Sequence, residues 1–102
     1  MRFDSLTDAV VNILCRYGRG GEIPLLEPFL RYNELVRRGE MLCTHWCTVF
    51  DSDRDPRLVQ FIGGVCCSII YVLKHLEAEG LIRIRREDGW IEINPKLCTE
   101  VA

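Results

Sequence analysis

The sequence predicts one small α+β domain that is mostly helical and ends in a two-stranded β-hairpin. Three observations support this: amphipathic helical patterns recur along the chain, an Asp-Gly pair separates two apolar stretches near the C-terminus, and 102 residues suffice for one core. Hydrophobic residues make up 48% of the chain and charged residues 27%, which is typical of globular proteins. We therefore expect a single domain over residues 1–102.

The first predicted helix spans Ser5–Tyr17. Its apolar residues recur at intervals of three and four: Leu6, Ala9, Val10, Ile13, Leu14 and Tyr17. The glycine-rich segment 18–21 is expected to be a flexible loop. A second helix is predicted over Glu27–Arg38, because Pro28 suits a first helical turn and Gly39 suits the residue after a helix.

The middle of the chain is harder to assign. Met41–Phe50 is rich in Thr, Trp, Val and Phe, which favours a strand, but another helical turn is equally compatible with it. Residues 51–56 read as a loop, and Asp55 can cap a helix over Pro56–Ile62. The two helices predicted first, Ser5–Tyr17 and Glu27–Arg38, together with the possible strand make up residues 1–50 of the predicted domain.

The last half of the chain has a clearer pattern. Gly63-Gly64 indicates a tight turn, since adjacent glycines are costly inside a helix, and a helix over Cys66–Glu79 follows. Two strands, Leu81–Glu87 and Trp90–Asn94, are joined by Asp88-Gly89, which predicts a two-residue turn. The register that follows pairs Ile84 with Ile93, Arg85 with Glu92, and Arg86 with Ile91.

Helix, glycine turn, helix and hairpin thus follow one another over residues 57–95. The stretch LVQFIGGVCCSIIYVLKHLEAEGLI, residues 58–82, resembles the core of the winged helix-turn-helix regulators of bacteria, archaea and archaeal viruses. Gly63 matches the turn glycine, and residues 77–82 match the exit from the recognition helix into the wing. The resemblance implies a helix-turn-helix over 56–79 and a wing over 81–95.

The resemblance further implies double-stranded DNA binding, sequence-specific or general, by a transcriptional regulator. The residues expected to contact DNA are Arg54, Arg57, Ser68, Tyr71, Lys74, His75, Arg83 and Arg85. Arg85 ranks above Arg86, which the predicted register places on the inner face of the hairpin. The alternative is a winged-helix protein-interaction module without DNA binding, because the start of the recognition helix lacks Arg, Asn and Gln.

Composition limits the partners. The net charge of −2 means that any basic patch is local. Since winged-helix regulators commonly bind as dimers, a homodimer through the N-terminal helices is expected. No apolar run approaches the ~18 residues of a membrane span and no signal peptide is evident, so we expect a cytoplasmic protein without a membrane partner. No motif indicates an enzyme, a cofactor or a small-molecule substrate.

Six cysteines are many for a cytoplasmic chain. They could be buried thiols or form a disulfide, as intracellular proteins of hyperthermophiles do, and the scarcity of Asn and Gln also suits a hyperthermophilic archaeal or viral source. Cys43, His45 and Cys47 are the one candidate metal cluster. In a strand the two cysteines lie roughly 13 Å apart, too far to share one zinc ion, whereas in a helix they would be ~6 Å apart and could both bind zinc. A structural zinc would need two further ligands, and the sequence has no second C-x-x-C motif. We therefore expect no metal site.

Overall fold

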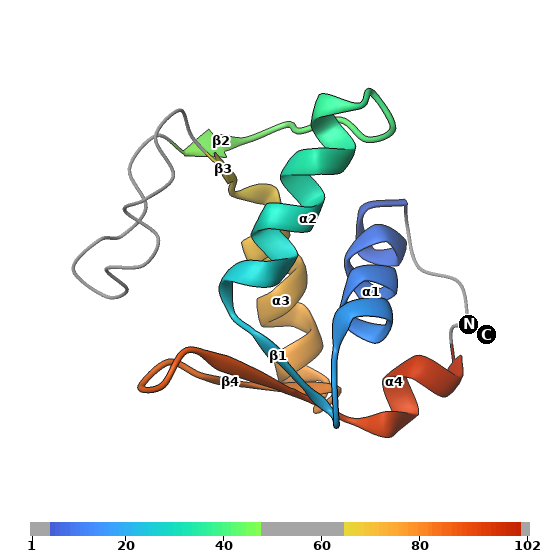
Figure 1. The fold of residues 1–102 in the computed structure, drawn as a ribbon, viewed down its shortest axis with the longest axis vertical. Coiled ribbons are helices and arrows are strands. Elements are labelled where there is room, and N and C mark those ends of the chain that lie inside the picture. The colour runs from blue at the N-terminus through green and yellow to red at the C-terminus, as the bar shows by residue number, and fades with distance from the viewer. Residues whose placement is uncertain (1–4, 48–64, 101–102) are drawn as a thin grey trace.

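The computed structural model describes residues 5–47 and 65–100 (Figure 1). Its elements in chain order are α1 (Ser5–Tyr17), β1 (Glu22–Pro24), α2 (Leu26–Arg37), β2 (Trp46–Cys47), β3 (Val65–Cys66), α3 (Ser68–Ala78), β4 (Ile82–Arg85), β5 (Trp90–Ile93) and α4 (Pro95–Glu100). The α+β class is confirmed. The predicted loop 51–56, the helix Pro56–Ile62 and the turn Gly63-Gly64 lie outside the described residues.

The long helices α1, α2 and α3 stand together over one end of a three-stranded antiparallel sheet (Figure 1). The sheet has the strand order β1-β5-β4, so β1 is paired with a strand that lies far from it in the sequence. A second, two-stranded sheet, β2-β3, lies at the other end of α2 (Figure 1). Among the described residues, no helix combines the length and the apolar character that crossing a membrane requires.

The core is shared by the helices and the inner side of the sheet. Its fully buried side chains include Val10, Leu14, Tyr32, Leu76, Ile91 and Leu97. Burying each Leu or Ile stabilises the fold by about 1.5–3 kcal/mol. The apolar side of α1 contributes Val10, Val11 and Leu14 to this core.

The predicted bounds of α1 match the structure, and those of α2 differ by one residue at each end. The predicted start of α3 is wrong. Residues 65–66 form strand β3, which pairs with β2, so the helix begins only at Ser68. Within the ambiguous segment 41–50, the described part contains the short strand β2.

The predicted loop 18–21 is a tight turn with defined hydrogen bonds, and the unpredicted strand β1 follows it. Arg19 and Glu22 exchange two backbone hydrogen bonds of 2.7 and 3.1 Å across a turn in which Gly20 and Gly21 have positive φ. Pro24 is tolerated because β1 lies at the edge of the sheet. The C-terminal hairpin therefore belongs to a three-stranded sheet rather than the predicted two-stranded one.

The predicted hairpin register is also wrong, by two residues. The observed pairs are Ile82 with Ile93, Arg83 with Glu92, Ile84 with Ile91, and Arg85 with Trp90. The loop is the four-residue segment 86–89, closed by a hydrogen bond of 2.9 Å from the Gly89 N–H to the Arg85 carbonyl. This register pairs isoleucine with isoleucine on the core side, whereas the predicted one would set Arg86 against Ile91.

Helix α4 was not predicted. Asn94 caps it, since its side-chain oxygen accepts a hydrogen bond of 2.9 Å from the Lys96 N–H, and Pro95 occupies the first helical position. The Cys15–Cys98 disulfide, with a Cα–Cα distance of 5.5 Å, ties α4 to α1. The sequence Asn-Pro was the available signal for this helix.

The cysteines are oxidised. Besides Cys15–Cys98, a disulfide joins Cys43 to Cys66, and Cys67 is disulfide-bonded as well. No cysteine in the described part of the chain is a free thiol. Of the two alternatives, buried thiols or a disulfide, the disulfide is therefore confirmed for these cysteines. Residues 5–47 and 65–100 contain no group of three side chains able to hold a metal ion.

Candidate nucleic-acid interface

Helix α3 buries one side and exposes the other. Its buried residues are Ser68, Ile69, Val72, Leu73 and Leu76. On the opposite side, Tyr71 is 67% exposed, and Lys74 and His75 are exposed beside it. Helical spacing of three and four residues brings these three side chains together, as the sequence predicted. His75 lies 3.8 Å from Glu79, one turn further on.

The first turn of α3 is covered by the segment before β2. The Cys67 N–H donates a hydrogen bond of 2.8 Å to the His45 carbonyl, and the hydroxyls of Thr44 and Ser68 are 3.2 Å apart. The predicted outward position of Ser68 is therefore wrong: its side chain is buried. The buried Asn33 side chain on α2 accepts a hydrogen bond of 3.1 Å from the Cys66 N–H. These contacts fix where α3 begins.

The β4–β5 hairpin is held in a defined position relative to α3. The Glu77 carboxylate accepts a hydrogen bond of 2.9 Å from the Ile84 N–H. Because β4 is an edge strand, this N–H would otherwise lack a protein partner. Gly80, with a φ of 75°, turns the chain from the helix into the strand. The hairpin thus comes directly after α3 in the chain and is fixed to the end of that helix.

Arg85, predicted to be a better DNA contact than Arg86, is not free. Its guanidinium lies 3.0 Å from Glu22, 3.1 Å from Glu92 and 3.3 Å from Asp88. Desolvation alone would lower the pKa of Arg85, but the charges of Asp88, Glu22 and Glu92 outweigh it and raise the pKa above its ordinary value. Three carboxylates therefore neutralise this side chain, and it is a poor candidate for a phosphate contact.

Two other wing arginines are more accessible. The side chain of Arg83 is 73% exposed, and its distance to Glu92 is 4.0 Å. Arg86 is exposed in the loop and has no acidic partner among the described residues, which corrects its predicted inner position. Sequence reasoning ranked it low because of the wrong register. Arg54 and Arg57 lie outside the described residues.

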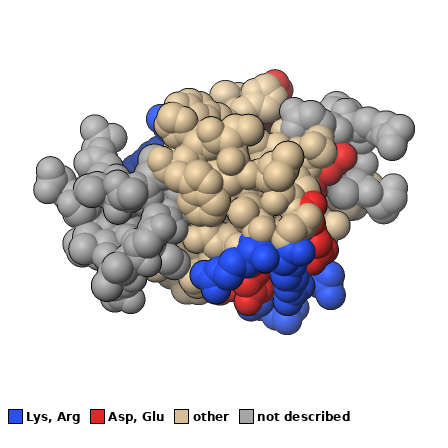
Figure 2. Space-filling view, turned by 90° about the horizontal axis from the view of Figure 1, so that it is seen from above, with Lys and Arg blue, Asp and Glu red and all other residues tan. Residues whose placement is uncertain are grey.

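Charged side chains are unevenly distributed over the surface. Seen from above, Lys and Arg gather at one edge together with Asp and Glu, while the middle of that face is uncharged (Figure 2). A broad basic surface of the kind that dominates many DNA-binding domains is not visible on this face. The basic side chains at this edge are accompanied by acidic ones (Figure 2).

Comparison with known proteins finds no matching family model, no matching curated protein and no matching solved structure.

Proposed function

We propose that the chain binds double-stranded DNA through the α3–hairpin surface, defined as Tyr71, Lys74, His75, Arg83 and Arg86, in the manner of a winged helix-turn-helix domain. The observation that carries the proposal is the exposure of Lys74 and Arg86, neither of which has an acidic partner among the described residues. Both are thus available to phosphate groups.

The element order supports this proposal. A winged helix-turn-helix domain needs an exposed helix followed at once by a β-hairpin, and α3 is followed by β4 and β5 after a short turn. The Glu77–Ile84 hydrogen bond keeps that hairpin beside the helix. A rigid link of this kind lets helix and hairpin engage one duplex together.

The same surface suggests how DNA would be recognised. The start of α3, which should reach base edges, has its first two residues, Ser68 and Ile69, buried and has no Arg, Asn or Gln. Base contacts are then limited to Tyr71, at the end of the first turn, and to Lys74 and His75 on the second turn. We expect binding that depends strongly on salt and only weakly on sequence, because phosphate contacts dominate.

Fluorescence anisotropy with a labelled duplex, measured over a series of salt concentrations, tests the proposal. Lys74→Ala and Arg86→Ala should each weaken binding uniformly across sequences and reduce the salt slope by about one. Lys96→Ala on α4 and Arg37→Ala at the end of α2 are matched controls, since both residues are exposed and lie off the surface. Absence of binding at low salt, or equal losses in the controls, would contradict DNA binding here.

One observation favours protein interaction as the second candidate function. Large apolar side chains are exposed, among them Leu42 at 84% in the segment before β2 and Trp46 at 50% in β2 itself. Exposed apolar residues that lie together often mark a protein contact. A chain that fails to bind duplex DNA at low salt would favour this candidate over the first.

A further inference from the structure

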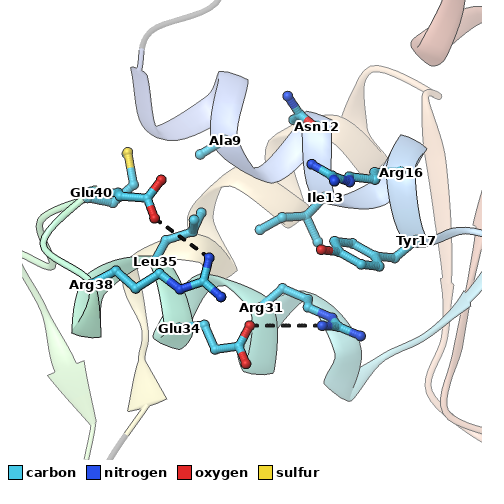
Figure 3. A pocket seen from close by; sticks show the side chains of 11 residues that line it. Ala9, Asn12, Ile13, Arg16, Tyr17, Arg31, Glu34, Leu35, Arg38 and Glu40 are labelled. Carbon is cyan, nitrogen blue, oxygen red and sulfur yellow. Dashed lines mark ion pairs between the residues drawn. The ribbon is translucent and has the colours of Figure 1, made fainter.

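A cleft between α1 and α2 lies apart from the α3–hairpin surface. It has a volume of about 480 Å³, within the range of small-molecule sites. None of the five residues of the α3–hairpin surface lines it. Its walls come from α1, from α2 and from the turn that follows α2 (Figure 3).

The floor of the cleft is apolar. Ile13 points from α1 and Leu35 from α2 toward the space between the helices (Figure 3). Ile13 is 5% exposed, and Ala9, Leu35 and Met41 are half-buried against the core. An apolar group placed here would release water from these four side chains, which favours binding.

Most charged groups at the rim are already paired. The Arg31 guanidinium lies 2.9 Å from Glu27 and 3.9 Å from Glu34, and it stacks on the Tyr17 ring at 4.1 Å from the centroid. Further along the same side of the cleft, just after α2, Arg38 and Glu40 are 3.7 Å apart. These groups are two arginines and three glutamates, so they supply no unpaired cation that could hold an anion.

Arg16 differs from the other arginines of the rim. It has no acidic partner among the described residues, and its guanidinium lies 5.8 Å from the centroid of the Tyr17 ring. Asn12, one turn earlier on α1, lines the same cleft (Figure 3). The planar guanidinium fork matches a carboxylate, and the Asn12 amide can donate a further hydrogen bond.

We propose that this cleft binds a small amphipathic carboxylate, with its apolar body on Ile13 and Leu35 and its carboxylate on Arg16 and Asn12. The proposal does not depend on DNA binding. The cleft is open to solvent and combines an apolar floor with an unpaired cation, Arg16, which is the pattern expected for a ligand that is apolar at one end and anionic at the other.

Isothermal titration calorimetry with naphthoate as the probe tests the site. Saturable binding is expected, and Arg16→Gln should weaken it about tenfold through loss of the charge-assisted contact. Arg37→Gln, an exposed arginine on α2 that does not line the cleft, is the matched control and should bind naphthoate as the wild type does. Equal melting temperatures of the two variants would show that both are folded.

The neutral analogue naphthalenemethanol separates the two parts of the proposal. It has the same apolar body without the carboxylate, so it should bind the wild type and Arg16→Gln equally and more weakly than naphthoate binds the wild type. The proposal is overturned if naphthoate shows no saturable binding, or if Arg16→Gln binds naphthoate as tightly as the wild type does. It is also overturned if the neutral analogue binds the wild type as tightly as naphthoate does.

Discussion

The Cys15–Cys98 disulfide should supply a large share of the stability of the fold. It joins α1 to α4 across a sequence separation of 83 residues. In the chain-entropy treatment, closing a loop of that length removes enough freedom from the unfolded chain to stabilise the native state by roughly 4.5 kcal/mol. Small domains are stable by only about 5–15 kcal/mol, so loss of this bond should be plainly measurable.

The perturbation is the double variant Cys15→Ala/Cys98→Ala. Both side chains are only half-buried, so truncating them leaves little cavity cost beside the lost cross-link. Urea denaturation followed by circular dichroism should show that the free energy of unfolding of the oxidised variant is lower than that of the oxidised wild type by roughly 4.5 kcal/mol. The Cys43–Cys66 bond closes a separation of 23 residues and should contribute less, roughly 3.4 kcal/mol.

A reductant provides the control for this prediction. Once every disulfide is reduced, the wild type and the double variant should have the same urea midpoint, because they then differ only in two partly exposed thiols. If the oxidised proteins already share one midpoint, the reasoning from loop closure is refuted for this chain.

Three further substitutions follow from particular contacts. Gly18→Ala should lower the melting temperature, with a cost of about 1–3 kcal/mol, because a Cβ atom there would lie 2.7 Å from both the Leu14 carbonyl oxygen and Ile93 Cδ1; an unchanged melting temperature would contradict the packing. Arg85→Ala should reduce stability in urea by leaving three carboxylates uncompensated, yet weaken DNA binding less than Arg86→Ala does; the reverse order of affinities would sink the assignment of Arg85 as neutralised. Tyr32 donates a hydrogen bond of 2.8 Å to the Leu42 carbonyl, and burial raises its pKa, so the native state holds the phenol proton more tightly than the unfolded chain. The free energy of unfolding should therefore fall as pH rises above about 10. Tyr32→Phe should lessen that fall but cost about 1 kcal/mol at neutral pH. Urea denaturation at neutral pH and again above pH ~10 would measure both effects.

The helices were predictable where one apolar stripe ran without interruption. In α1 the stripe begins and ends with the helix, and on α3 the same periodicity correctly separated Tyr71, Lys74 and His75 from the buried side. Ser68 could not be assigned in this way. Its burial depends on the segment around Thr44, which is distant in sequence and packs over the first turn of α3.

The sheet was less predictable because its stability comes from contacts between distant strands. Asp88-Gly89 favours a two-residue turn locally, but pairing Ile82 with Ile93 on the core side selects a longer loop. The neutralisation of Arg85 depends partly on Glu22, which reaches it only because β1 joins the sheet. The disulfide pairing was likewise open, since six cysteines allow 15 connectivities.

Mapping the duplex contact by nuclear magnetic resonance tests the central claim most directly. Addition of a short DNA duplex to the isotope-labelled protein should shift the backbone amides of Tyr71, Lys74, His75 and the loop 86–89, while those of α4 stay unchanged. Shifts confined to α4 or to the segment before β2, or no shifts at low salt, would contradict a DNA-binding surface formed by α3 and the hairpin.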